Sequence, residues 1–219
     1  MDHPLLELFL ACLDRQYVDT REGASWAFDW YGDRLFLWFE HSNGLRDWKN
    51  NLSFAAAPYS AMDPPWYAHA GFLLVYRSLL PTVAPLILDP KILGICTVGY
   101  SHGAALALLC HEYAWYHRPD LRDTLVGYGF GCPRVLYGCP PEEVTLRWQS
   151  FFRICNTDDI VTKLPPRALG YCHVGTPIVI GAHGRYSAID AHRPESYIRE
   201  LSLDLENAQN PHADGENNY

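Results

Sequence analysis

Two kinds of apolar pattern alternate along the chain. Short runs rich in β-branched and aromatic residues are typical of buried strands, and longer runs have the spacing of helices. The predicted strands are RLFLWFEH (34–41), ILGICTVGY (92–100), TLVGYGFG (124–131), FFRICNTDDIV (151–161, ending in a loop) and HVGTPIVIGAHG (173–184). The predicted helices are residues 69–87, 104–117 and 193–205. Because strands alternate with helices, the pattern predicts an α/β fold with a mostly parallel sheet covered on both faces.

The two ends of the chain differ in pattern. Near the N-terminus Leu5, Phe9, Leu13 and Tyr17 recur every four residues, which predicts an amphipathic helix over the core. Acidic residues stand where a signal peptide carries basic ones, so we expect no export signal and predict a cytoplasmic protein. Residues 206–219 are polar and are predicted to be a loose tail.

No linker divides the sequence, so residues 1–219 are predicted to form a single domain. Pro81 and Pro85 are predicted to interrupt the end of the helix over 69–87. We find no apolar run that approaches the about 18 residues a membrane span needs, so no transmembrane segment is expected.

Composition and charge limit the classes of partner. The net charge is −8, from 25 acidic and 17 basic residues, which argues against a nucleic acid. A neutral substrate such as an ester would not be repelled. The seven cysteines include no Cys-x-x-Cys pair, so a metal site is not expected and reduced thiols are the default interpretation.

The stretch GYSHG places Ser101 between Gly99 and Gly103, where a predicted strand becomes a predicted helix. A turn sharp enough to expose the serine brings the backbone so close that side chains at both flanking positions would clash. The helix that follows offers free N–H groups and the positive end of its dipole, which stabilise an oxyanion. The pattern therefore indicates a nucleophilic serine, and the alternative is a tight turn with a solvent-facing serine.

A nucleophilic serine needs a base and an acid that orients the base. In α/β-hydrolases they follow in the order Ser, Asp or Glu, His, which leaves only the downstream histidines. We favour His192, which lies just before a predicted helix, with His173 as the main rival. Asp158 and Asp159 both follow a predicted strand, and spacing alone does not separate them.

The ordered motifs resemble those of the class 3 lipase family, which includes fungal triacylglycerol lipases and related feruloyl esterases. The resemblance covers roughly residues 33–197 and implies the α/β-hydrolase fold. The matching segments are HAGF (69–72), GYSHGAALALL (99–109), GFGCPRV (129–135), NTDDIVTKLPP (156–166), GYCHVG (170–175) and DAHRPESYI (190–198). In the family pattern the catalytic aspartate directly precedes Ile-Val, which falls on Asp159, and the base falls on His192.

The resemblance also implies an oxyanion hole. One donor would be the backbone N–H of His102, and FEHSNGLRDW (39–48) resembles the segment whose Ser or Thr supplies the other, which falls on Ser42. The family has Arg-Gly where this chain has Glu40-His41. The alternative for Ser42 is an ordinary residue of a Ser-Asn-Gly turn. The family mostly has leucine at position 102, and we interpret His102 as a residue of the pocket rim.

Residues 44–68 resemble the family's lid and mix aromatic side chains with charges. Such a segment could cover an acyl pocket in water, with Trp48, Phe54 and Trp66 as its substrate-facing residues. The alternative is a packed surface loop that never opens.

These residues predict a serine hydrolase that cleaves acylglycerol-like esters through an acyl-enzyme, with no cofactor and with contact to a lipid interface. The enzyme alternatives are a soluble short-chain or feruloyl-type esterase and a phospholipase A1. The alternative of another class is a binding protein on a hydrolase scaffold, which only the altered loop at Glu40 and His41 favours.

Overall fold

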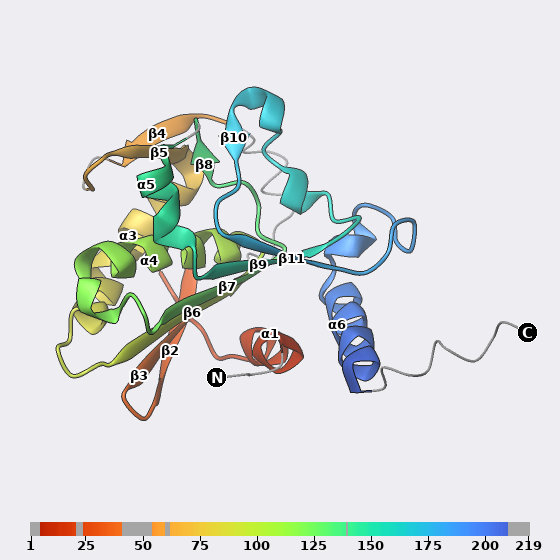
Figure 1. Cartoon of the computed structure of the whole chain (residues 1–219), viewed down its shortest axis with the longest axis horizontal. Coiled ribbons are helices and arrows are strands. Elements are labelled where there is room, and N and C mark those ends of the chain that lie inside the picture. The colour runs from red at the N-terminus through yellow and green to blue at the C-terminus, as the bar shows by residue number, and fades with distance from the viewer. Residues whose placement is uncertain (1–4, 21–23, 41–53, 60–61, 139, 210–219) are drawn as a thin grey trace, which may run out of the picture.

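Two sheets organise the computed structural model, which describes residues 5–20, 24–40, 54–59, 62–138 and 140–209 (Figure 1). Within these residues the larger sheet has the order β1 (Val18–Asp19), β2 (Ser25–Tyr31), β3 (Arg34–Phe39), β6 (Gly94–Tyr100), β7 (Leu125–Phe130), β9 (Phe151–Asn156) and β11 (Thr176–Ile180). The strands from β3 to β11 are parallel, and β1 and β2 extend them antiparallel. The predicted mostly parallel sheet is confirmed.

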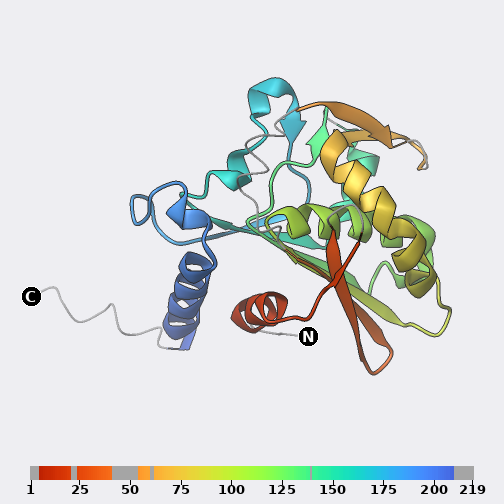
Figure 2. The same ribbon diagram turned by 180° about the vertical axis from the view of Figure 1, so that it is seen from behind.

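Helices cover the large sheet from both sides (Figures 1 and 2). On one side lie α1 (Leu5–Leu13) and α6 (Pro194–Gln209), and on the other lie α3 (Ala70–Ile87), α4 (His102–His117) and the short α5 (Glu142–Thr145). Strand side chains alternate between these two cores: Leu37 and Phe39 join the α3–α4 side, whereas Phe36 and Trp38 join the α1–α6 side. This alternation follows from the period of two along a strand.

The four-stranded second sheet has the order β10 (Tyr171–Cys172), β8 (Leu136–Tyr137), β5 (Trp66–His69) and β4 (Ala56–Tyr59). Its strands pair antiparallel and lie beyond α3 and α4 (Figure 1). The sequence analysis did not predict this sheet, because its strands are only two to four residues long.

Part of the segment predicted as a lid belongs to this second sheet. Residues 41–53, with Trp48, lie outside the described residues, but β4 and all of β5 except His69 fall within 44–68. Trp66 is only 2% exposed, stacks on Tyr59 with ring centroids 4.6 Å apart, and donates its indole N–H to Glu112 at 3.2 Å. The prediction that Trp66 faces substrate from a lid is therefore wrong, because its ring packs in the core.

Two further expectations need correction. Helix α3 continues through Pro81 and Pro85 to Ile87. Both prolines lie on the exposed face, where water can bond the freed carbonyls, while Val83 and Ile87 keep the opposite face buried. At the other end of the chain α6 extends to Gln209, so the predicted loose tail begins no earlier than residue 210, outside the described residues.

Helix α3 also reaches the length and composition of a membrane span, which the sequence analysis did not expect. Its 18 residues have a mean hydropathy of 1.5. In the structure one third of this window is buried, and Leu73, Leu79 and Val83 pack into the α3–α4 core. Core packing therefore accounts for its buried face, while Leu74 on the outer face is 67% exposed.

Three 3-10 turns carry residues needed below: Val161–Lys163 (η3), Arg167–Leu169 (η4) and Asp190–His192 (η5). Two more, Pro119–Leu121 (η1) and Leu146–Trp148 (η2), connect elements on the α3–α4 side.

The buried His111 of α4 should make stability depend on pH. Burial lowers the pKa of His111 to about 3, whereas the unfolded chain takes up the proton near pH 6.5. Between these values the unfolded state binds the extra proton, so the free energy of unfolding should fall as the pH falls. His111→Gln should reduce that slope by up to about 1.4 kcal/mol per pH unit. Urea unfolding between pH 7 and pH 4 measures it, and equal slopes in the two proteins would contradict the prediction.

Candidate active site

Ser101 lies at a strained junction between β6 and α4. Its φ of 56° and ψ of −118° place it in a region that residues other than glycine rarely adopt. A Cβ on Gly99 would lie 2.2 Å from the carbonyl oxygen of Gly103, and one on Gly103 would lie 2.1 Å from that of Phe39. The predicted clash at both flanking positions is confirmed, and glycine is required at each.

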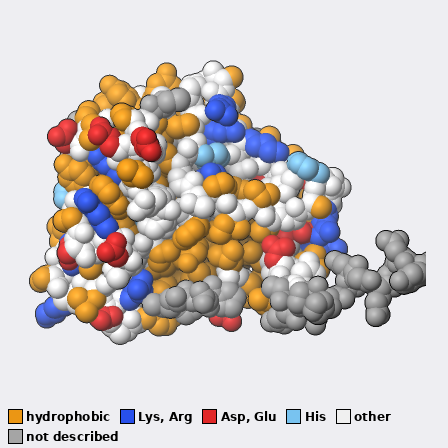
Figure 3. Space-filling model, viewed as in Figure 1, with side chains coloured by type: hydrophobic (Ala, Val, Ile, Leu, Met, Phe, Trp, Pro, Cys, Tyr) orange, Lys and Arg blue, Asp and Glu red, His pale blue; other side chains and the backbone are white. Residues whose placement is uncertain are grey.

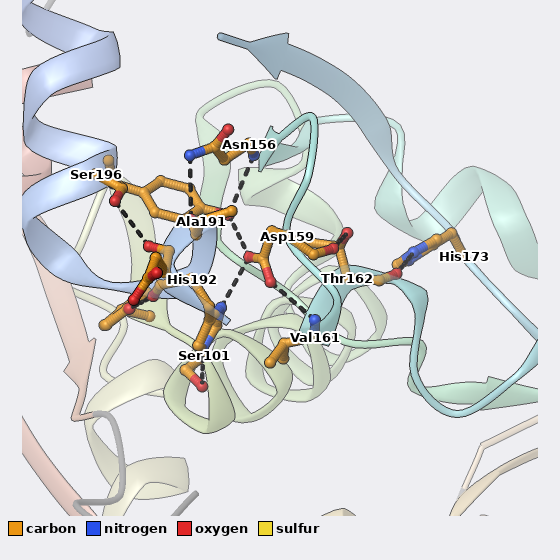
Figure 4. Close-up of polar contacts among 12 residues, drawn as sticks. Ser101, Asn156, Asp159, Val161, Thr162, His173, Ala191, His192 and Ser196 are labelled. Carbon is orange, nitrogen blue, oxygen red and sulfur yellow. Dashed lines mark hydrogen bonds and ion pairs between the residues drawn. The ribbon is translucent and has the colours of Figure 1, made fainter. Parts of the chain in front are cut away.

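The serine is hydrogen-bonded in line with a histidine and an aspartate (Figure 4). Ser101 Oγ lies 2.8 Å from Nε2 of His192, and Nδ1 of His192 lies 2.7 Å from Oδ2 of Asp159. Ser101 directly follows β6, Asp159 lies in the loop after β9, and His192 ends η5. The structure thus brings together the three side chains that the sequence analysis selected.

Asp159 is fully buried, yet both of its carboxylate oxygens accept hydrogen bonds. Oδ1 accepts from the backbone N–H of Val161 at 2.8 Å, and Oδ2 accepts from the hydroxyl of Tyr197 at 2.7 Å as well as from His192. Burial, and then the Asp159 charge, raises the pKa of Tyr197 well above its usual range, so Tyr197 stays a donor. These bonds compensate for the removal of the carboxylate from water.

Several groups fix the imidazole of His192. The ring of Tyr100 stacks on it, with centroids 5.2 Å apart and an interplanar angle of 27°, and the Tyr100 hydroxyl donates to the His192 carbonyl. Asn156 Nδ2 donates to the carbonyl of Ala191 at 3.0 Å, which holds the turn that precedes the histidine (Figure 4). The base is therefore oriented by its backbone, by its ring face and by Asp159.

Gly131 leaves room for this pair, a role that the sequence analysis missed. Its φ is +58°, and a Cβ there would lie 2.9 Å from Cε1 of His192 and 3.2 Å from Oδ2 of Asp159. The available signal was its place in the GFGCPRV segment. Tyr100 and Tyr197 were also missed as supports, although Tyr100 directly precedes the serine.

The rival candidates have other contacts. His173 places Nε2 2.8 Å from the carbonyl oxygen of Thr162 (Figure 4), and burial lowers its pKa to about 3. Asp158 contacts Nδ1 of His183 at 3.1 Å and accepts from the N–H of Gly184 at 2.8 Å. The hydrogen bond with His183 is the main reason that the pKa of Asp158 is lowered. Of the adjacent aspartates, Asp159 faces the imidazole and Asp158 holds the turn after β11.

The predicted oxyanion hole is described only in part. The backbone N–H of His102 is the first of α4, and the first N–H groups of a helix have no partner within the helix. The His102 ring lies 5.6 Å from that of Phe72, and burial lowers its pKa to about 4, so it is neutral at pH 7. Ser42 lies outside the described residues. Phe54 is half-buried, with its ring 6.5 Å from that of His69.

Comparison with known proteins agrees with this arrangement. The sequence model of the family described as "Lipase (class 3)" matches residues 36–169, more than half of the chain. The chain belongs to the class 3 lipase family. The match includes Ser101 and Asp159 and ends before His192, so the position of the histidine rests on the structure.

A curated relative, named "Lipase", from Rhizomucor miehei is 29% identical over 146 residues. These residues are 64% of this chain and 40% of that protein, so the chain spans less than half of the relative's length. The match therefore covers only part of that longer protein.

Solved structures share the fold of this class 3 lipase family member. The lipase from Rhizopus microsporus var. chinensis superposes with a TM-score of 0.67 and 24% identity, covering 85% of this chain and 69% of that one. The Rhizomucor miehei lipase propeptide complex gives 0.68 and 22%, covering 85% and 66%. These identities establish the fold alone, and the predicted α/β-hydrolase fold is confirmed.

Gly131 and Gly138 provide a matched pair of substitutions. Both have positive φ, but a Cβ on Gly138 would have no atom within 4 Å, whereas one on Gly131 would reach His192. Gly131→Ala should therefore slow the labelling of Ser101 by a fluorophosphonate at least tenfold, because the histidine must shift from the serine. Gly138→Ala carries the same backbone strain and should label at nearly the parent rate. Equal labelling rates for the two variants would contradict this account of Gly131.

Proposed function

We propose that this protein hydrolyses carboxylic esters through an acyl-enzyme on Ser101. One observation carries the proposal: the unbroken line of hydrogen bonds from Ser101 through His192 to buried Asp159, with the serine on a strained turn at the start of a helix. Membership of the class 3 lipase family supports the same chemistry.

The proposed mechanism follows from which atoms face each other. Asp159 accepts the N–H of Nδ1, which leaves the lone pair of Nε2 directed at the Ser101 hydroxyl. His192 takes that proton as Ser101 Oγ attacks the ester carbonyl, and it then delivers the proton to the leaving alcohol. In the second half of the reaction His192 takes a proton from a water molecule as its oxygen attacks the acyl-enzyme. The proton then passes to Ser101 Oγ, and the carboxylic acid is released.

The negative charge that develops on the carbonyl oxygen needs donors that are already in place. In the proposal the N–H of His102, at the positive end of α4, is one of them. Ser42 stays the predicted second donor. Asp159 acts on His192 alone, by fixing its tautomer and stabilising the imidazolium that forms.

The proposed substrates are acylglycerol-like esters at a lipid surface. A structural relative from Aspergillus oryzae is a mono- and diacylglycerol lipase, with a TM-score of 0.62 and 24% identity, covering 80% of this chain and 66% of that one. A soluble short-chain or feruloyl-type esterase and a phospholipase A1 are the alternatives within the same chemistry. A cytoplasmic location stays a further proposal, supported by free thiols at all six described cysteines.

Removal of the nucleophile tests the proposal. Ser101→Ala should lower the hydrolysis of p-nitrophenyl esters by several orders of magnitude. The melting temperature should stay within a few degrees of the parent, because the change removes only the hydroxyl of a partly exposed side chain. A fluorophosphonate should label the parent at Ser101 and leave the variant unlabelled. Full turnover in the variant, or labelling at another serine, would assign the chemistry to a different residue. An inactive parent protein would favour the alternative of a binding protein.

The same assay, extended over acyl length, separates the substrate classes. An acylglycerol lipase should prefer medium or long chains and gain rate when the ester forms droplets. A preference for acetate or feruloyl esters, with smooth saturation, would support the soluble esterase.

The adjacent aspartates give a matched test of the base's partner. Asp159→Asn should lower kcat by about 10⁴-fold, since the imidazole then presents the wrong tautomer to Ser101. Asp158→Asn should change kcat less than tenfold, because Asp158 contacts the exposed His183 instead. Both substitutions remove one negative charge, so a general charge effect would act on both. Similar losses in the two variants would refute the assignment.

A further inference from the structure

An exposed apolar groove runs over the second sheet. It encloses about 630 Å³ and is lined by Phe54, Ala55, Ala56, Tyr67, Tyr137 and Leu169. Three of its large side chains are strongly exposed for apolar residues: Tyr67 at 51%, Tyr137 at 40% and Leu169 at 48%. Contiguous patches of this kind mark interaction surfaces.

The groove is continuous because neighbouring elements pack side by side. Tyr67 of β5 stands opposite Tyr137 of β8 in the strand register. The Tyr137 ring covers Gly170, where an added Cβ would lie 3.0 Å from it, and Leu169 directly precedes that glycine. The apolar surface therefore passes from β5 across β8 to η4.

Three basic residues come from the segments of chain that adjoin Leu169 and η4. Arg167 and Leu169 share that single turn, and Lys163 ends η3 just before it. Arg134 holds the segment between these two turns: its backbone N–H donates to the carbonyl of Leu164 at 2.7 Å, and its guanidinium donates to those of Lys163 and Pro165. Figure 3 shows Lys and Arg side chains gathered beside hydrophobic ones at the top of the molecule, where Figure 1 places β10.

The charge of this cluster is not compensated within the described part of the chain. Arg134, Lys163 and Arg167 form no ion pair with an acidic group of the described residues. After burial, the neighbouring charges of Arg167 and Arg153 are the next causes that lower the pKa of Arg134. A locally positive field thus exists on a chain whose net charge is −8.

We propose that the groove and the three cations together dock the protein on a lipid surface that carries anionic headgroups. The inference rests on the proposed function and names the surface that would meet the lipid. Tyrosine is suited to the boundary between headgroups and acyl chains, and leucine to the acyl side. Lysine and arginine next to an anionic surface each strengthen binding. The anionic headgroups would repel the acidic remainder of the chain, so the protein would favour the orientation in which this surface faces the lipid.

The docking surface is continuous with the site through a short segment of backbone. Asp159 accepts the N–H of Val161, which begins η3, and Lys163 ends that same turn. Lys163 therefore lies on the segment that also holds Asp159, the partner of His192. Docking would hold this end of the molecule at the surface where ester substrate is dissolved.

Vesicle binding of the Ser101→Ala protein tests the inference without hydrolysis of the lipid. Partitioning is measured by co-sedimentation with phosphatidylcholine vesicles and with vesicles that also contain phosphatidylglycerol. Binding should be stronger to the anionic vesicles and should weaken as salt is added. Lys163→Gln should reduce it about fivefold, and Lys163→Gln with Arg167→Gln about 25-fold. Lys91→Gln removes an exposed cation from the loop between α3 and β6, outside this cluster, and serves as the matched control.

Leu169→Ser tests the apolar part and should weaken binding to both kinds of vesicle several-fold. Melting temperatures confirm that each variant is folded. Equal binding to neutral and anionic vesicles, or equal effects of Lys163→Gln and Lys91→Gln, would overturn the proposal. So would self-association that Leu169→Ser abolishes while vesicle binding persists, since the surface would then fit a second copy. Hydrolysis of a soluble ester by the parent protein is measured separately, so loss of docking and failure of the proposed chemistry are distinguishable.

Discussion

The close approach of α4 to the large sheet is the constraint on which the rest of the structure depends. At the start of the helix, side chains at Gly99 or Gly103 would collide with backbone, and Gly129 of β7 faces the Cβ of Ala104. Such a short separation brings the first N–H groups of the helix directly behind Ser101 and forces the serine into its strained conformation. The same approach buries α4 on nearly every side, which explains its run of alanine and leucine.

The serine is held by one junction, but its partners come from loops that need separate support. Asp159 and His192 are 33 residues apart and meet only because β9 and the turn η5 end at the same edge of the sheet. Tyr197 from α6 bonds the carboxylate, and Tyr100 from β6 stacks on the imidazole. Each partner is therefore tied to an element that packs against the sheet, and the geometry of the loops depends on the core beneath them.

The sequence specified those features that depend on local chemistry. Strand periodicity located the parallel strands, and the glycines around Ser101 identified the turn because their requirement is steric. Spacing could not separate Asp158 from Asp159, since adjacent side chains differ only in direction; the family pattern chose Asp159. The second sheet was missed because its strands are only two to four residues long and because β8 joins β5 and β10 across long stretches of chain. Trp66 was misjudged for a related reason: an indole among charges resembles a mobile surface until its buried partner Glu112 is known.

Glu112 also explains how the second sheet is tied to the nucleophile. Its carboxylate pairs with Arg147 at 2.6 Å and accepts from Trp66 of β5, while Arg147 donates to the carbonyl of Asp63 at 2.8 Å. Burial raises the pKa of Glu112, and the hydrogen bond from Arg147 opposes that shift. Removing one partner of such a pair leaves an uncompensated buried charge, so the strand cannot leave the helix without a large cost. Because α4 begins directly after Ser101 and carries Glu112, the second sheet and the reactive serine are attached to the same helix. Contact with a lipid surface through the second sheet would then set the distance of the serine from that surface, without any movement of the sheet itself.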